Sequence, residues 1–274
     1  MPELPEVETT RRGIAPHLEG QTFRNVVVRQ KKLRWDVPEI GDILPGLHIG
    51  RVRRRAKYLL IECVQGERQV GTLIMHLGMS GSLRVLPADT PPQKHDHIDL
   101  HFGKQCLRLR DPRRFGAVLW TQEPPEQHPL LASLGPEPLS DDFNADYLFN
   151  KAKTRKSPIK QLLMDGKIVV GVGNIYATES LFLSGIHPSR KCNRVSGTRL
   201  QSLVENVKIV LAYAIERGGT TLRDFQQQDG RPGYFQQELM VYGREGEQCR
   251  QCGTLIKAKQ IGQRTSTYCP NCQR

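Results

Sequence analysis

The apolar positions in the first part of the chain follow one helical period and then a series of strand-like runs. Val7, Ile14 and Leu18 fall near one face of a helix and Pro5 suits its first turn, so the pattern predicts a helix over residues 5–18. Beyond it, short β-branched or alternating runs separated by Gly- and Pro-bearing turns predict strands. These runs are Asn25–Arg29, Lys57–Val64, Gly71–Met75, Gly81–Val85, His97–Phe102, Cys106–Arg110 and Phe115–Trp120. Their spacing favours an antiparallel β-sandwich.

One of these runs, His97–Phe102, alternates polar and apolar residues and is expected to form a half-buried strand. Asp96 and Asp99 have no evident cluster of partner carboxylates. We therefore expect them to lie at a strand edge, and a metal-dependent nuclease fits the sequence poorly.

The apolar period becomes helical after a proline-rich stretch. Residues 121–142 contain five prolines, which indicate a linker or an irregular crossing segment. Residues 218–237 are rich in Gly, Gln and Thr and predict a mobile loop. Between them three helices are predicted: Ile159–Met164, Ile175–Leu183, and a stripe from Leu200 to Ile215 that stops at Gly218-Gly219.

Composition narrows the class of protein. Hydrophobic residues make up 38% of the 274 positions, and no apolar run is long enough to span a membrane. Glu3, Glu6 and Glu8 interrupt any signal peptide, so a cytoplasmic, bacterial-type protein is expected.

The net charge of +12 is unevenly distributed along the chain: residues 1–150 hold 20 basic and 19 acidic residues, whereas residues 151–274 hold 20 basic and 9 acidic residues. This asymmetry favours a nucleic-acid partner over a merely solvated basic surface.

Four of the seven cysteines form two closely spaced pairs near the C-terminus. Cys249-x2-Cys252 and Cys269-x2-Cys272, sixteen residues apart, match a four-thiolate zinc ribbon, so one structural Zn²⁺ is expected. The intervening segment, Thr254–Thr267, is long enough for a β-hairpin that carries Arg264 on its return arm. Arg264 could equally be a solvent-exposed residue.

The chain opens Met1-Pro2-Glu3, and removal of Met1 would leave a prolyl secondary amine beside a carboxylate. A chain-terminal amine titrates near roughly 7.7–8.0, so much of it is nucleophilic at neutral pH. Attack on a sugar aldehyde carbon would give an iminium, which serves as an electron sink in covalent catalysis. Taken alone, Pro2 could instead be an ordinary second residue.

Each of three further motifs could have either a role in DNA binding or catalysis or an ordinary structural role, such as a turn, a packed side chain or a solvated surface. The basic run Arg51–Lys57 is expected to be a solvated face that contacts phosphates. The apolar residues after Lys57 offer a less favoured alternative, in which Lys57 is drawn inward and its pKa is lowered for acid–base work. Gly171–Asn174 places backbone amides and an Asn cap at a helix start, where a phosphate could bind. Arg113 and Phe115 follow the turn at Asp111 and could wedge into a base stack, while Met79 lies between two glycines on a loop.

Together these motifs resemble one family, the formamidopyrimidine-DNA glycosylases, over essentially the whole chain and in the same order. The matching segments are Pro2–Thr9, Arg54–Leu59, His76–Gly81, Asp111–Gly116, Gly171–Tyr176 and the final zinc ribbon. The resemblance implies a bifunctional base-excision repair enzyme that removes oxidised purines from double-stranded DNA and cuts the strand at the abasic site.

The resemblance also implies roles for individual residues. Pro2 resembles the Schiff-base nucleophile, Glu3 the acid that protonates the opening sugar, Lys57 the proton donor in β-elimination, and Arg264 the δ-elimination residue. Contacts to DNA are implied for His76, Met79, His95, Arg113, Phe115, Arg155, Asn174 and Tyr242, of which Met79, Arg113 and Phe115 fill the vacated space. Arg155 stands where a lysine is expected, and Thr220–Tyr234 matches the loop that closes over the lesion.

The implied organisation is an N-terminal antiparallel β-sandwich with flanking helices, followed by a helix–two-turn–helix domain that carries a zinc hairpin. DNA would lie in a basic cleft between the two domains. We expect the catalytic domain over residues 1–135, a linker over 136–150, the helical DNA-binding domain over 151–238 and the zinc finger over 239–274. A monomer is expected.

Two alternatives remain open. An endonuclease VIII-like glycosylase for oxidised pyrimidines would share the fold and the amine nucleophile, although Leu4 favours the purine branch. A non-catalytic zinc-ribbon DNA-binding protein would explain the charge and the cysteines but not Pro2-Glu3 with Lys57.

Overall fold

The computed structural model describes residues 2–218 and 238–274, which form two compact units. Of the described residues, the first unit contains 2–132 and Gly218, and the second contains 133–217 and 238–274. The predicted loop over 218–237, with its segment Thr220–Tyr234, lies outside the described residues except for Gly218. No helix among the described residues has the length and hydropathy needed to cross a membrane.

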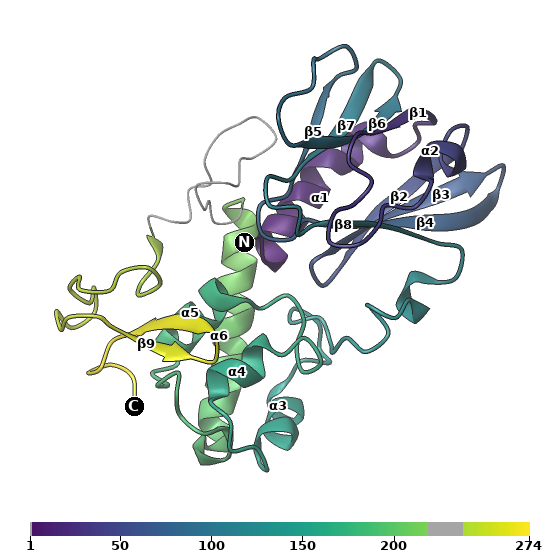
Figure 1. The fold of residues 1–274 in the computed structure, drawn as a ribbon. Helices are drawn as coiled ribbons and strands as arrows, with labels where there is room; N and C mark the ends of the chain where they lie inside the picture. Colours follow the sequence, from purple (N-terminus) through teal and green to yellow (C-terminus); the bar gives the residue numbers. More distant parts are fainter. Residues whose placement is uncertain (1, 219–237) are drawn as a thin grey trace. The chain divides into compact units, whose positions relative to one another are not determined.

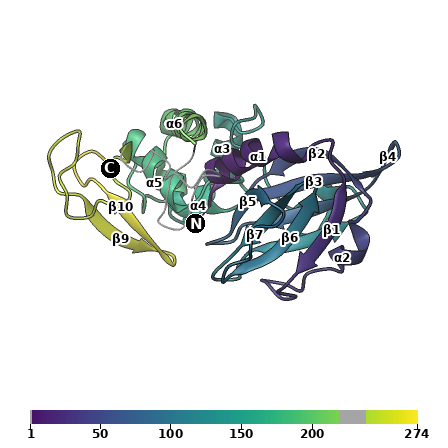
Figure 2. The same ribbon diagram turned by 90° about the horizontal axis from the view of Figure 1, so that it is seen from above.

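The first unit is a sandwich of two four-stranded antiparallel sheets (Figures 1 and 2). One sheet has the order β1-β6-β7-β5 and the other β2-β3-β4-β8. The strands are β1 (Phe23–Val28), β2 (His48–Arg55), β3 (Tyr58–Gln65), β4 (Arg68–His76), β5 (Ser82–Pro87), β6 (Asp96–Phe102), β7 (Gln105–Arg110) and β8 (Ala117–Thr121). Alternate apolar residues of both sheets share one core with the helix α1 (Leu4–Leu18), and the predicted sandwich is confirmed.

Two short elements complete this unit, α2 (Ile40–Ile43) and the 3-10 turn η1 (Pro125–Gln127). Strand β2 was not predicted, because its run of arginines hides the two core positions Ile49 and Val52. Phe115 was predicted to begin a strand, but β8 starts at Ala117 and Phe115 lies in the preceding turn.

The prediction of a half-buried strand over His97–Phe102 was wrong. β6 is a central strand, and both of its faces are largely covered: His97 and Asp99 are buried like Ile98 and Leu100, and only His101 is half-buried. Buried polar groups need partners, and the partners of these side chains lie on neighbouring strands and loops.

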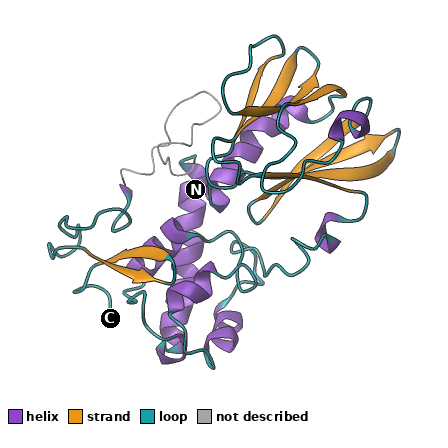
Figure 3. Cartoon of the chain, viewed as in Figure 1, coloured by secondary structure: helices purple, strands orange, loops and turns teal. Residues whose placement is uncertain are grey.

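The second unit is mainly helical and ends in a β-hairpin (Figure 3). Its elements are α3 (Ala145–Ala152), α4 (Ile159–Met164), α5 (Asn174–Leu183), the 3-10 turn η2 (Cys192–Arg194), α6 (Gly197–Glu216), β9 (Lys257–Ile261) and β10 (Arg264–Tyr268). α5 is buried on nearly all sides, and it packs against α6, α4 and β10. The helices predicted within 159–215 and the hairpin are confirmed, whereas the short helix α3 was not predicted.

Candidate active site

Pro2 and Glu3 lie at the start of α1, in a reciprocal capping arrangement. Glu3 is the N-cap residue, and its amide donates to Oε2 of Glu6 at 2.8 Å. The Glu3 carboxylate in turn accepts from the Glu6 amide, which forms a capping box. Pro2 is buried, and Glu3 is only 1% exposed. The helix start therefore fixes the backbone that joins the candidate nucleophile to the candidate acid.

Lys57 lies in the tight turn between β2 and β3, next to Ala56, whose φ is +54°. Tyr58, the first residue of β3, pairs in register with His76 at the end of β4, and their ring centroids are 4.8 Å apart. The turn thus brings Lys57 and His76, two of the candidate site residues, to the same end of one sheet.

His76 has a defined protonation state. Burial and the neighbouring charges of Lys57 and Arg34 lower the pKa of His76 to about 4. Its Nδ1 accepts a hydrogen bond from the Gly78 amide at 3.0 Å, so the neutral ring carries its proton on Nε2. His76 can therefore offer a neutral N–H donor to a phosphate oxygen at pH 7.

The basic run before Lys57 does not form a uniformly solvated face, which corrects the sequence-based expectation. Arg53 Nε donates to Glu62 at 2.7 Å, and Arg54 Nε reaches Glu8 at 3.2 Å. The Glu8 carboxylate also accepts from Arg11 and Arg12, and this cluster ties β2 to α1. Two of the arginines therefore stabilise the fold through carboxylates.

The candidate residues for filling a vacated base site lie on two loops of the first unit. The guanidinium of Arg113 lies 5.0 Å from the centroid of the Phe115 ring, and Phe115 is 45% exposed. Met79 is half-buried on the loop between β4 and β5. His95, just before β6, is half-buried with a φ of +76°.

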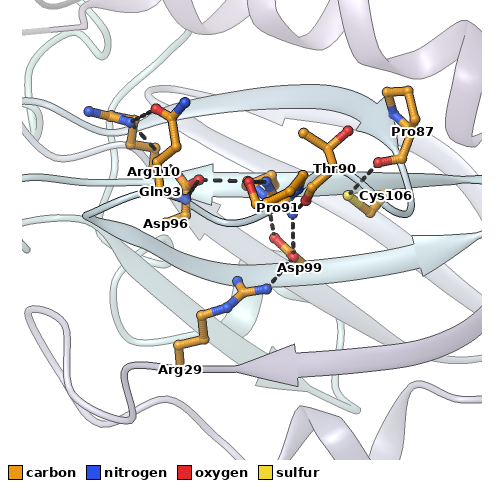
Figure 4. A network of polar contacts seen from close by, with 10 residues as sticks. Arg29, Pro87, Thr90, Pro91, Gln93, Asp96, Asp99, Cys106 and Arg110 are labelled. Carbon is orange, nitrogen blue, oxygen red and sulfur yellow. Dashed lines mark hydrogen bonds and ion pairs between the residues drawn. The ribbon is translucent and has the colours of Figure 1, made fainter.

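Asp96 and Asp99 were expected at a strand edge, but they lie on β6, which β1 and β7 flank, and both belong to the polar network drawn in Figure 4. Arg108 donates to both carboxylate oxygens of Asp99, at 2.7 and 2.8 Å. It also donates to the carbonyls of Thr90 and Pro91, at 2.8 and 3.2 Å, and lies 3.6 Å from Asp96. The network fastens the loop that leads to His95 onto the outer face of the sheet.

In the second unit, α5 organises three of the candidate residues. Asn174, its first residue, donates from Nδ2 to the carbonyl of Thr265 at 3.1 Å, next to Arg264. Glu179, on the same helix, accepts the backbone amide of Tyr242 at 2.8 Å. One helix thus carries Asn174 and is bonded to the backbone of Tyr242 and of Thr265, the neighbour of Arg264.

The predicted Asn cap is wrong in detail. Gly173 is the N-cap residue of α5, and the Asn174 side chain bonds to the hairpin and does not cap the helix. Arg155 lies apart from this group, on the loop between α3 and α4, with its NH1 3.8 Å from Asp165.

The four predicted cysteines converge on one point. Their Sγ atoms all lie within 4.8 Å of one another, with Cys249–Cys272 at 4.0 Å and Cys252–Cys269 at 3.4 Å. A tetrahedral zinc with Zn–S bonds of about 2.3 Å requires sulfur separations of about 3.8 Å, so the donor set fits Zn²⁺. All four ligands come from the protein, and this is the geometry of a closed structural zinc site.

Sequence reasoning missed three buried charged residues that support the site. Glu6 could have been found, because a carboxylate three residues after an N-cap is a capping-box signal. Glu179 and Lys160 have no such signal. Glu179 accepts three consecutive backbone amides from Met240 to Tyr242, and Lys160 donates to Ser266 Oγ at 2.7 Å.

The sequence of the chain matches known families and proteins along most of its length. Residues 1–118 match the formamidopyrimidine-DNA glycosylase N-terminal domain, residues 134–226 the formamidopyrimidine-DNA glycosylase H2TH domain, and residues 246–274 the zinc finger found in FPG and IleRS. The chain is 56% identical over 276 residues to the formamidopyrimidine-DNA glycosylase of Stenotrophomonas maltophilia, with all of both chains covered.

Solved structures give the same result. A mutant of Lactococcus lactis FPG in complex with Fapy-dG containing DNA superposes with a TM-score of 0.91 at 32% identity, covering 100% of each chain. The Lactococcus lactis Fpg bound to DNA with an abasic site also gives a TM-score of 0.91 at 32% identity, covering 99% of each chain.

Proposed function

This chain belongs to the formamidopyrimidine-DNA glycosylase family, and from that premise we propose that it excises oxidised purines from duplex DNA and cleaves the abasic strand through Pro2. It is a base-excision repair DNA glycosylase. The proposed substrates are 8-oxoguanine and formamidopyrimidines. The observation that best supports this chemistry is the placement of Pro2 directly before Glu3, which the capping box fixes at the start of α1.

The proposed reaction begins once Met1 is removed. The Pro2 nitrogen attacks the deoxyribose C1′, the glycosidic bond breaks, and the base leaves with the electron pair of that bond and takes up the proton that the Pro2 nitrogen loses. Glu3 protonates the ring oxygen as the sugar opens to an iminium. The iminium then accepts electrons when the C2′ proton is lost, so that the 3′ phosphate departs.

The remaining roles divide between the two units. Lys57 assists β-elimination, and Arg264 assists the δ-elimination that releases the 5′ phosphate. His76, Asn174 and Tyr242 hold phosphates around the extruded nucleotide, while Met79, Arg113 and Phe115 fill the gap it leaves. His95 and Arg155 add contacts to DNA. Zinc holds the hairpin that carries Arg264 and takes no part in bond breaking.

A trapping experiment tests this proposal. The mature protein is mixed with an 8-oxoguanine duplex, borohydride and EDTA, and a covalent protein–DNA adduct is expected because borohydride reduces the iminium. The adduct should disappear in protein that retains Met1, whose Pro2 nitrogen is an amide. It should weaken in Pro2→Gly, whose terminal nitrogen is a primary amine in place of the prolyl secondary amine. Pro5→Ala, which changes a proline of the same helix start, is the matched control and should still give the adduct.

Other outcomes would point elsewhere. A gel shift without an adduct would indicate a non-catalytic DNA-binding protein. Cleavage without trapping that fails in EDTA would indicate a metal-dependent nuclease. Faster trapping on an oxidised pyrimidine than on 8-oxoguanine would favour the endonuclease VIII-like alternative.

We further propose that the protein acts as a monomer in the bacterial cytoplasm, associated with the nucleoid through DNA. One chain supplies every residue in the proposed reaction. Light scattering during size-exclusion chromatography, with and without a damaged duplex, should give one protein per duplex; a dimer in either sample would contradict the proposal.

A further inference from the structure

Asp111, directly after β7, is completely buried, and its carboxylate joins two loops of the first unit. Oδ1 accepts from the Ser80 hydroxyl at 2.7 Å, and Oδ2 accepts from the Gly116 amide at 2.7 Å. Ser80 Oγ also accepts from the Arg113 amide at 3.0 Å. The segments that follow Met79 and precede Gly116 are thus held by one carboxylate and one hydroxyl.

The backbone of Asp111 extends these links to a third segment. Its amide donates to the His95 carbonyl at 3.1 Å, and its carbonyl bonds to His97 Nε2 at 2.8 Å. The same carbonyl accepts from the Arg114 amide at 3.2 Å. His95 and Arg114 both have left-handed backbones, with φ of +76° and +55°, a conformation that persists only when surrounding contacts enforce it.

The two loops touch through their backbones. A Cβ on Gly78, whose φ is +63°, would lie 2.4 Å from the Phe115 carbonyl carbon and the Gly116 nitrogen. A Cβ on Gly116 would lie 2.8 Å from the His76 carbonyl and 2.9 Å from Asp111 Oδ2. Backbone atoms are involved in both clashes, and the one side-chain atom, Asp111 Oδ2, is itself held by the Gly116 amide, so the loops hold one relative position, which the Asp111 carboxylate selects.

From this geometry we propose that Asp111 is the positioning residue that sets the relative placement of Met79, Arg113, Phe115 and His95. The inference rests on the proposed function, in which these four residues contact DNA. Asp111 itself touches no DNA. It governs how the duplex is opened and how the base opposite the lesion is read, while the covalent chemistry at Pro2 is independent of it.

The carboxylate is required because it only accepts hydrogen bonds. Asp111→Asn keeps the volume but turns one oxygen into a donor, which must face either the Gly116 N–H or the Ser80 hydroxyl. If the new amide N–H faces Ser80, the Ser80 hydroxyl proton loses Oδ1 as its acceptor, while the hydroxyl oxygen already accepts from the Arg113 amide. If it faces Gly116, two N–H donors oppose each other. One buried group is left unsatisfied, and the loops should shift to relieve it.

The test compares duplex and single-stranded substrates in Asp111→Asn and in Ser80→Ala. We expect Asp111→Asn to lower excision from an 8-oxoguanine:cytosine duplex by about tenfold or more, the effect of leaving one buried polar group unpaired. Discrimination between cytosine and adenine opposite the lesion should collapse. Borohydride trapping on a single-stranded abasic oligonucleotide should stay within about twofold of the parent, because no gap has to be filled there.

Two further variants keep the inference testable if Asp111→Asn folds poorly. Ser80→Ala removes the bridging hydroxyl and should give the same duplex-specific loss, smaller in size. Asp89→Asn, at an exposed carboxylate on the loop between β5 and β6, is the matched control and should behave like the parent. The effects of Asp111→Asn and Ser80→Ala should be less than multiplicative in the double variant, because both break one network.

The outcomes separate the inference from the proposed function. Absence of trapping in the parent protein would overturn the function itself. Normal parental trapping with unchanged duplex excision and unchanged opposite-base discrimination in Asp111→Asn and Ser80→Ala would overturn the positioning role. An equal loss on duplex and single strand in both variants would also overturn it, because it would show a general defect.

Discussion

The amide of Glu3 donates a hydrogen bond to Oε2 of Glu6 at 2.8 Å, so a residue outside the proposed chemistry fixes the backbone on which Pro2 and Glu3 sit. Glu6→Ala removes this acceptor, and we expect it to lower the free energy of unfolding by about 1 kcal/mol, as for other helix caps. Trapping on abasic DNA should slow as well, because the helix start frays. Urea unfolding and single-turnover trapping measure the two effects.

Glu6→Gln is the matched control, since glutamine retains an acceptor oxygen at the third helical position. It should keep most of the stability and most of the trapping rate. Equal losses in the two variants would show that the charge of Glu6, and not its hydrogen bond, is what matters.

Elements with a regular apolar period or a characteristic residue spacing could be predicted from the sequence. α1 and most sandwich strands have regular apolar periods, and the zinc ribbon follows from cysteine spacing alone. β2 could not be predicted in this way, because a strand whose outer positions are arginines lacks the polarity contrast on which periodicity depends. The partners of those arginines are Glu62, on the adjacent strand β3, and Glu8, on α1.

In the candidate site, too, some residues could be predicted from the sequence and others could not. Pro2, Lys57 and the cysteines stand out by chemistry or by motif. The residues that hold them, such as Glu179 and Asp111, are ordinary acidic residues in the sequence, and their roles depend on contacts made only after folding. Asp99 was misplaced for this reason: its partner Arg108 lies on the adjacent strand, and alternation alone cannot distinguish a solvated polar face from a covered one.

The pairing of Asp99 with Arg108 makes the free energy of unfolding depend on pH in the acid range. Burial alone would raise the pKa of Asp99, but hydrogen bonds from Arg108 and Arg29 hold it below its ordinary value. A depressed carboxylate pKa contributes stability above the unfolded value near 4, and this contribution is lost as the pH falls through the folded pKa. Urea unfolding between pH 7 and pH 3 should therefore show stability falling steeply below about pH 4.

Asp99→Asn should remove part of this acid dependence and destabilise the protein at pH 7. It leaves Arg108, which is 3% exposed, with only the longer 3.6 Å contact to Asp96 as an ion pair, and breaking a buried pair costs up to about 3–5 kcal/mol. Asp89→Asn serves as the exposed control. A pH profile of Asp99→Asn parallel to that of the parent would contradict this account.

His76 should remain neutral throughout the physiological pH range. Burial and the charges of Lys57 and Arg34 lower its pKa to about 4. An NMR titration of the DNA-free protein should therefore show the His76 ring changing protonation near pH 4, with Nε2 protonated above it. Because the folded pKa is lowered, this residue favours folding above the unfolded value near 6.5, and the contribution declines as the pH falls toward 4. A His76 midpoint above pH 6 would refute the neutral donor role.

Loss of zinc should separate the two elimination steps. Lys160 and Asn174 hold β10 through Ser266 and Thr265, but the rest of the hairpin depends on the four thiolates around the metal. Cys249→Ser, or prolonged chelation, should release one zinc per chain, lower duplex affinity and reduce δ-elimination, because the hairpin carries Arg264.

The Schiff base at Pro2, which lies in the other unit, should form on single-stranded abasic DNA with little change. Zinc content by atomic absorption, affinity by fluorescence anisotropy and the ratio of β- to δ-products on gels are the three measurements. Cys106→Ala, which removes a buried cysteine of the first unit, is the control and should retain its zinc. An unchanged product ratio in protein shown to be zinc-free would mean that the hairpin holds Arg264 in place without the metal.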